Sequence, residues 1–162
     1  MSLKFFNTLS REKEEFSPID KNEVRMYTCG PTVYGYPHIG NYRAYIFADT
    51  LKRVLLYAGF KVKHIMNLTD VDDKTIRDSQ KENKSLKEFT EFYSEEFFKD
   101  IKFLNILAPE KFTKATDYIN EMVEITKKLL DKKLAYKSDD GSIYFDIKKF
   151  KNYGKLSGVV LE

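Results

Sequence analysis

A strand–helix–strand pattern between residues 24 and 66 constrains the fold of this chain more than any other feature of its sequence. Residues 24–28 and 61–66 are short β-prone runs, and residues 41–58 between them repeat apolar side chains at helical spacing. Gly59 follows the helical run as a natural stop. Two strands joined through a helix run parallel within one sheet. The pattern therefore predicts an α/β fold with a parallel sheet.

The rest of the chain predicts one early strand, two more helices and a hairpin. A strand is expected over residues 4–9, and Ser85 with Glu88 forms a capping box for a helix that ends before Ala108-Pro109. A second helix is expected over residues 117–133, and Asp139-Asp140-Gly141 between β-prone runs predicts a hairpin. The residues expected to face the core are Ala44, Phe47, Ala48, Leu51, Val54, Leu55 and Ala58 in the helix over 41–58, and Ile119, Met122, Val123, Leu129 and Leu130 in the helix over 117–133.

Composition excludes several classes of protein. With 162 residues, of which 42% are hydrophobic, the chain is long and apolar enough to bury a core. Its single cysteine excludes a disulfide framework and a zinc site built from several cysteines of this chain. No apolar run approaches the roughly 20 residues of a membrane span, and the N-terminus does not resemble a signal peptide. We therefore expect a cytoplasmic protein without a membrane partner. The net charge of +3 permits a nucleic-acid partner without arguing for one.

The loop from Cys29 to Asn41 is the best candidate for a binding site. It leaves the carboxyl end of the first parallel strand and enters a helix N-terminus, which is where ligands bind in open α/β sheets. Free N–H groups at a helix start favour phosphate, and His38 and Asn41 can add hydrogen bonds to phosphate oxygens. Gly40 lets a flat base lie close to the backbone. Neither a P-loop nor a G-x-G-x-x-G fingerprint occurs in the chain.

Five short motifs resemble one family. Pro37-His38-Ile39-Gly40-Asn41 resembles the H-I-G-H signature of class I aminoacyl-tRNA synthetases, and Cys29-Gly30-Pro31-Thr32-Val33-Tyr34 is similar to the form found in cysteinyl-tRNA synthetases. The segments 67–74 and 153–157 also resemble that family, as does Asn7-Thr8-Leu9 near the start. Asn41 stands where the signature has its second histidine, and its amide can still donate to phosphate.

The resemblance implies a domain organisation. Residues 1–82 would form the first half of a Rossmann-like nucleotide-binding fold, and residues 83–162 a helical segment, a β-hairpin and the start of a connective insertion. The family's K-M-S-K-S loop, the second half of its catalytic fold and its anticodon-binding domain have no counterpart in these 162 residues. We therefore expect this chain to be inactive alone, and the full-length enzyme to be a monomer.

The resemblance also implies a reaction and a set of site residues. The full-length enzyme would activate L-cysteine with ATP and Mg²⁺ to cysteinyl-adenylate and transfer the cysteine to tRNA(Cys). The ATP-binding residues would be His38, Gly40 and Asn41, with His38 and Asn41 acting in catalysis. The cysteine pocket would be lined by Cys29, Gly30, Thr32, Asn67 and Thr69. Cys29 would also be the first ligand of a Zn²⁺ ion that separates cysteine from serine, with the other ligands on sequence beyond this chain. His64 is expected to be structural.

Two other functions stay open at this point. A related ligase joins activated cysteine to an amino-sugar and would share Cys29, His38 and Thr69, although such ligases tend to have proline where this chain has Val33. A short, non-catalytic paralogue that binds a nucleotide, tRNA or a partner protein is the third possibility. Sequencing the gene past codon 162 separates the paralogue from the enzymes, because a continued frame with K-M-S-K-S would exclude it.

Overall fold

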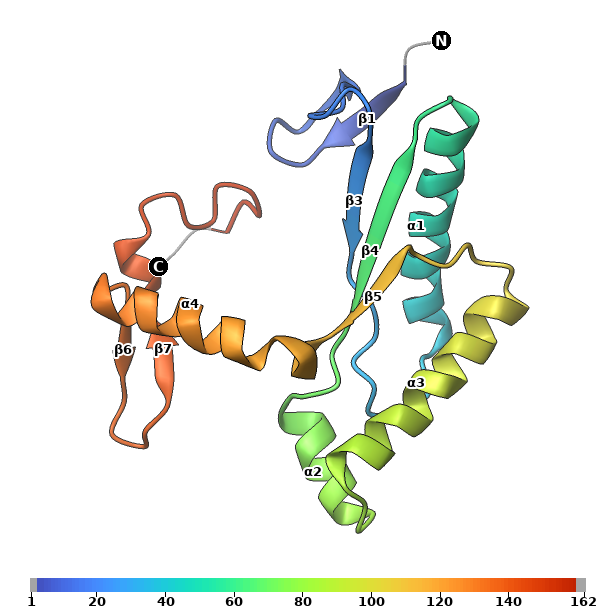
Figure 1. Cartoon of the computed structure of the whole chain (residues 1–162). Helices are drawn as coiled ribbons and strands as arrows, with labels where there is room; N and C mark the ends of the chain where they lie inside the picture. Colours follow the sequence, from blue (N-terminus) through green and yellow to red (C-terminus); the bar gives the residue numbers. More distant parts are fainter. Residues whose placement is uncertain (1–2, 160–162) are drawn as a thin grey trace. The chain divides into compact units, whose positions relative to one another are not determined.

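The structure is a computed structural model that describes residues 3–159 (Figure 1). The chain forms two compact units, one of residues 18–118 and one that combines residues 1–17 with 119–162. The larger unit contains the parallel sheet and the candidate site. The division at residue 82 that the family resemblance implies stays a prediction.

The larger unit is built on a three-stranded parallel sheet in the order β3–β4–β5. The strands are β3 (Val24–Thr28), β4 (Val62–Leu68) and β5 (Lys111–Lys114). Helix α1 (Ile39–Tyr57) connects β3 to β4, and helices α2 (Asp73–Lys81) and α3 (Leu86–Phe103) connect β4 to β5 (Figure 1). The predicted α/β fold with a parallel sheet is confirmed.

The core of this unit lies between one face of the sheet and helices α1 and α3. Strand β4 alternates buried and exposed residues, so that every second side chain points toward the helices. The central cluster consists of Tyr45, Met66, Leu68, Phe97 and Ile101. Phe97 has no exposed surface, and truncation of such a side chain costs about 3–5 kcal/mol. The predicted capping box of α3 is confirmed, since Ser85 N donates to Glu88 Oε2 at 3.1 Å and Glu88 N donates to Ser85 Oγ at 3.2 Å.

The apolar face predicted for α1 is wrong in part. The helix buries Tyr45, Ala48, Lys52 and Leu55. Of the predicted inward residues, Ala44 and Ala58 are exposed, Val54 is partly exposed, and Phe47 is 71% exposed. The buried stripe includes Tyr45, whose ring packs against Phe97, and Lys52, whose ammonium binds Ala108 O and Glu110. A hydrophobicity pattern does not select such residues.

The smaller unit contains two antiparallel pairs and one helix. Strand β1 (Lys4–Asn7) pairs with β2 (Glu12–Glu15), and β6 (Ala135–Lys137) pairs with β7 (Ile143–Phe145). The second pair is the predicted hairpin. A short 3₁₀ turn, η2 (Ile147–Lys149), follows it.

Helix α4 (Ile119–Asp131) follows the 3₁₀ turn η1 (Ala115–Tyr118), which ends the larger unit. The predicted inward face of α4 is wrong at Ile119, Met122 and Val123, because each is more than 40% exposed. No helix within residues 3–159 is long and apolar enough to cross a membrane.

Candidate active site

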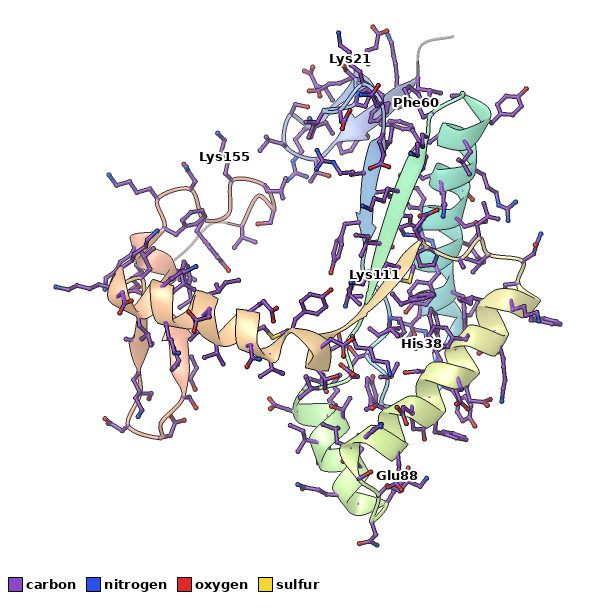
Figure 2. The ribbon with its side chains drawn as sticks, in the orientation of Figure 1. Lys21, His38, Phe60, Glu88, Lys111 and Lys155 are labelled. Carbon is purple, nitrogen blue, oxygen red and sulfur yellow. The ribbon has the colours of Figure 1, made fainter. Side chains whose placement is uncertain are left out.

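A cavity of about 240 Å³ opens at the carboxyl end of the parallel sheet. Most of its lining comes from the loop between β3 and α1, and the remainder comes from the first turns of α1 and α2. The lining residues are Gly30, Pro31, Thr32, Tyr34, Gly35, Tyr36, Pro37, His38, Asn41, Tyr45 and Lys74. The predicted site residues Gly30, Thr32, His38 and Asn41 therefore share one cavity, and Figure 2 marks His38 at the start of α1.

His38 and Asn41 form a reciprocal cap at the start of α1. The backbone N–H of Gly40 donates to Nδ1 of His38 at 3.0 Å, and the backbone N–H of His38 donates to Oδ1 of Asn41 at 3.0 Å. Because Nδ1 accepts a hydrogen bond, the neutral imidazole carries its proton on Nε2. The cap leaves His38 Nε2–H and the Nδ2 amide of Asn41 as two hydrogen-bond donors at the cavity.

Gly40 is required by the geometry of this cap. A Cβ atom at position 40 would lie 2.8 Å from Cε1 and 2.9 Å from Nδ1 of His38. Any larger residue would therefore push the imidazole out of its capping position. This steric reason for glycine differs from the one predicted from the sequence, that a flat base lies close to the backbone of Gly40. The contact with a base stays a prediction.

The loop that starts at Cys29 is tied to the end of β4 through the backbone. Thr69 N donates to Pro31 O at 2.9 Å, and Val33 N donates to Thr69 O at 3.1 Å. These bonds form a parallel bridge between Thr32 and Thr69. Two residues predicted for the cysteine pocket, 37 positions apart in the sequence, therefore lie side by side.

The side chain of Asn67 organises the same region. Its Oδ1 accepts from the backbone N–H of Gly30 at 3.1 Å and from the hydroxyl of Tyr27 at 3.2 Å, and its Nδ2 donates to Thr69 Oγ1 at 3.2 Å. A Cβ atom on Gly30 would lie 1.8 Å from the carbonyl oxygen of Asn67, so only glycine fits there. Gly30, Thr32, Asn67 and Thr69 thus form one connected cluster.

Sequence reasoning missed Tyr27, which joins this cluster through its phenol. Tyr27 pairs with Ile65 in the register of β3 and β4, so it lies on the same face of the sheet as Asn67. That alternation was the available signal. The side chain is 68% exposed.

Cys29 lies beside this cluster with an exposed thiol, whose Sγ is 3.6 Å from Gly30 O. Burial raises the pKa of the neighbouring Tyr45 phenol to about 12, and the charge of Cys29 adds to this shift. Within residues 3–159, no group of three or more His, Cys, Asp or Glu side chains could hold a metal ion. The described residues thus offer one thiolate ligand and do not build a zinc site by themselves, so the role of Cys29 as a zinc ligand stays a prediction.

His64 lies outside the cavity and inside the core. It is 2% exposed, and its Nε2 is 2.7 Å from Thr28 Oγ1. Its backbone N–H donates to Glu110 Oε2 at 2.6 Å, and Glu110 Oε1 pairs with the buried ammonium of Lys52 at 2.9 Å. Burial lowers the pKa of His64, and the charge of Lys52 lowers it further. These contacts join α1, β4 and the start of β5.

Sequence reasoning also missed Lys74, which lines the cavity. It is the second residue of α2, and its ammonium lies 4.9 Å from the ring centre of Tyr34 in the loop before His38. It is the last residue of the 67–74 segment that resembles the family, and this was its signal in the sequence.

Comparison with known proteins agrees with this geometry. Residues 15–162 match the family model of the class I (C) tRNA synthetase catalytic domain. The chain is 53% identical to the cysteine–tRNA ligase of Koribacter versatilis over 157 residues, which are 97% of this chain and 32% of that protein. It is 52% identical to the enzyme of Methanosarcina mazei over 155 residues, covering 96% of this chain and 33% of the other. The chain thus spans about a third of the length of these relatives.

A solved structure supports the fold. The Agrobacterium radiobacter LeuRS–tRNA–LeuAMS ternary complex aligns with a TM-score of 0.63 and 21% identity, covering 76% of this chain and 16% of that one. At this identity the likeness concerns the fold alone, which is that of a class I synthetase. Together with the family match, it shows that the chain belongs to the cysteinyl-tRNA synthetase family of class I aminoacyl-tRNA synthetases.

Proposed function

We propose that this chain forms the part of a cysteine–tRNA ligase that binds ATP and cysteine. The whole enzyme would use ATP and Mg²⁺ to form cysteinyl-adenylate and would then transfer cysteine to tRNA(Cys). The observation that carries this proposal is the His38–Asn41 cap, which points two hydrogen-bond donors at a cavity beyond the carboxyl end of the sheet. Family membership supplies the chemistry that such a cavity would serve.

Adenylate formation depends on position and charge rather than on proton transfer. The cysteine carboxylate attacks the α-phosphorus of ATP in line, the bond to the bridging oxygen breaks, and pyrophosphate leaves. Donors fixed in advance near the phosphates stabilise the charge that develops. Gly40 N and Asn41 N are already bonded to His38, so we assign this role to the side chains of His38 and Asn41.

The cluster around Asn67 would hold the cysteine substrate. Thr69 Oγ1 accepts from Asn67 Nδ2, which leaves its hydroxyl proton free to donate to the substrate. Cys29 at the edge of this cluster would contribute one zinc ligand, and a bound zinc ion would favour the substrate thiolate over the hydroxyl of serine. Gly30 keeps its small size so that the loop can lie against β4.

Cysteine-dependent exchange between ATP and radiolabelled pyrophosphate tests this proposal. In the full-length protein that contains this chain, His38→Ala and Asn41→Ala should each lower the exchange rate by roughly 100-fold, the usual cost of one transition-state donor. Asn22→Ala, an exposed asparagine outside the cavity, is the matched control and should leave the rate unchanged. The 162-residue chain alone should show no exchange.

Exchange combined with an assay of cysteine transfer to tRNA(Cys) or to an amino-sugar separates the alternative functions. A full-length protein that charges tRNA(Cys) supports the proposal. Transfer of activated cysteine to an amino-sugar instead of tRNA would favour the related ligase, and absence of any cysteine-dependent exchange in the full-length protein would contradict both enzymes.

A further inference from the structure

Lys74 is the only lining residue of the cavity with an aspartate, glutamate, lysine or arginine side chain. The other polar groups of the lining are hydroxyls, the Asn41 amide and the neutral imidazole of His38. A cavity that holds a cation and several neutral donors, and no carboxylate, favours an anion.

The position of Lys74 in α2 does not stabilise that helix. A cation in the first turn faces the positive end of the helix dipole, which costs about 0.3–1 kcal/mol. The cap of α2 is made without it, because Asp72 Oδ1 accepts from Thr75 N at 2.8 Å and Asp72 N donates to Thr75 Oγ1 at 2.8 Å. A residue that departs from local preference in this way is typical of a functional site.

Lys74 is also free of carboxylate partners in the described part of the chain. None of the ion pairs formed by residues 3–159 includes it. Its ammonium is instead held over the ring of Tyr34, at 4.9 Å from the ring centre. A cation–π contact restrains a lysine without neutralising it, so the charge stays available to a ligand.

We infer that Lys74 binds a phosphate group of the substrate in the same cavity as His38 and Asn41. This inference rests on the proposed function, under which the phosphate belongs either to ATP or to the 3′-terminal CCA nucleotides of tRNA. Both sources present the same anionic oxygens. Lys74 is thus a binding residue that the family signature around His38 does not include.

Direct binding tests this inference without requiring activity. The 162-residue chain is titrated with ATP and, separately, with a 5′-phosphorylated CCA trinucleotide, and backbone amide shifts are followed by NMR. Lys74→Met should weaken binding of one or both ligands by about tenfold, as expected for a lost charge-assisted hydrogen bond. Lys74→Arg should bind within about twofold of the wild type, since it keeps the charge.

Lys81→Met is the matched control, because Lys81 lies in the last turn of the same helix and pairs with Asp78 at 3.3 Å. It should leave both affinities unchanged. If Lys74 contacts a phosphate, the wild type should lose most of its affinity advantage over Lys74→Met when the ionic strength is raised to about 0.5 M. If the role of Lys74 is purely structural, the difference in affinity should not depend on salt.

The outcomes separate the two phosphate sources. Weaker binding of ATP alone assigns the contact to the nucleotide, and weaker binding of the trinucleotide alone assigns it to tRNA. Equal affinity of Lys74→Met and the wild type for both ligands would overturn the inference, and so would a wild-type chain that binds neither ligand at millimolar concentration. Failure of pyrophosphate exchange with intact phosphate binding would count against the proposed function and not against Lys74.

Discussion

The backbone N–H of Gly40 donates to Nδ1 of His38 at 3.0 Å, and this contact decides which nitrogen of the imidazole faces a ligand. With Nδ1 occupied as an acceptor, Nε2 carries the proton and can donate. Gly40 of the signature thus helps to set the tautomer of His38. Because Gly40 and His38 act together, a substitution of Gly40 should also displace His38.

Gly40→Ala should impair the site while leaving the fold intact. The new Cβ would lie 2.8 Å from the His38 ring, so the ring must leave its cap. We expect a loss of ATP affinity of about tenfold or more, together with at most about 1–2 kcal/mol of stability for the lost cap. Asn22→Ala, an exposed change outside the cavity, is the control. Calorimetric ATP titration and urea unfolding measure both effects, and equal ATP affinity of the two variants would contradict the role of Gly40.

Asn67→Ala should destabilise the chain more than Tyr27→Phe does. It removes the acceptor of Gly30 N and Tyr27 OH and the donor to Thr69. We expect a loss of about 1–3 kcal/mol in the free energy of unfolding, because partly buried groups are left unpaired. Tyr27→Phe removes only the contact of an exposed phenol and should cost less than about 1 kcal/mol. Urea unfolding of the two variants checks the order, and a larger effect of Tyr27→Phe would refute it.

Sequence reasoning found the strand–helix–strand unit because apolar periodicity there follows burial. It failed on the inner face of α1, where Tyr45 is buried and Lys52 is buried with its ammonium bonded to Ala108 O. It also missed β2 (Glu12–Glu15), which carries only charged side chains, and β5 (Lys111–Lys114), which is too short to show alternation. Such strands are set by pairing with neighbours and not by their own composition.

The family motifs predicted more residues of the candidate site than the pattern of strands and helices did. Gly30, Thr32, His38 and Asn41 line one cavity, whereas Cys29, Gly40, Asn67 and Thr69 are not among its lining residues. Asn67 joins Gly30 and Thr69 by hydrogen bonds beside the cavity, and the roles of all these residues stay predictions. Tyr27 and Lys74 were missed because strand register and a ring contact bring them to the site.

In the ion pair between Lys52 and Glu110, loss of the glutamate should destabilise the chain more than loss of the lysine. The Lys52 side chain is 5% exposed and that of Glu110 is 46% exposed. Glu110 accepts hydrogen bonds from two donors, Lys52 Nζ and His64 N. Glu110→Gln keeps one acceptor oxygen and places its amide NH₂ against the second donor. We expect a loss of about 2–3 kcal/mol in the free energy of unfolding. Lys52→Met leaves a carboxylate that water can solvate and should cost about 1 kcal/mol or less. Urea unfolding of both variants measures the two stability losses. A larger loss for Lys52→Met would show that burial of the lysine does not decide the cost of breaking the pair.

His64 should make the stability of the chain depend on pH in a defined direction. Burial and the charge of Lys52 lower its pKa from the ordinary value of 6.5, and its Nδ1 is buried without a hydrogen-bond partner among the described residues. The imidazolium form would carry an N–H at Nδ1 that has no acceptor among the described residues.

At a pH between the lowered pKa of folded His64 and 6.5, the unfolded chain binds more protons than the folded one. Stability therefore falls as the pH decreases below that upper limit. The free-energy advantage of the wild type over His64→Gln should shrink when urea unfolding is moved from about pH 7.5 to about pH 5.5, because only the wild type pays this protonation cost. NMR titration gives an independent reading, since a His64 ring that titrates above 6.5 would contradict both the sign and its cause.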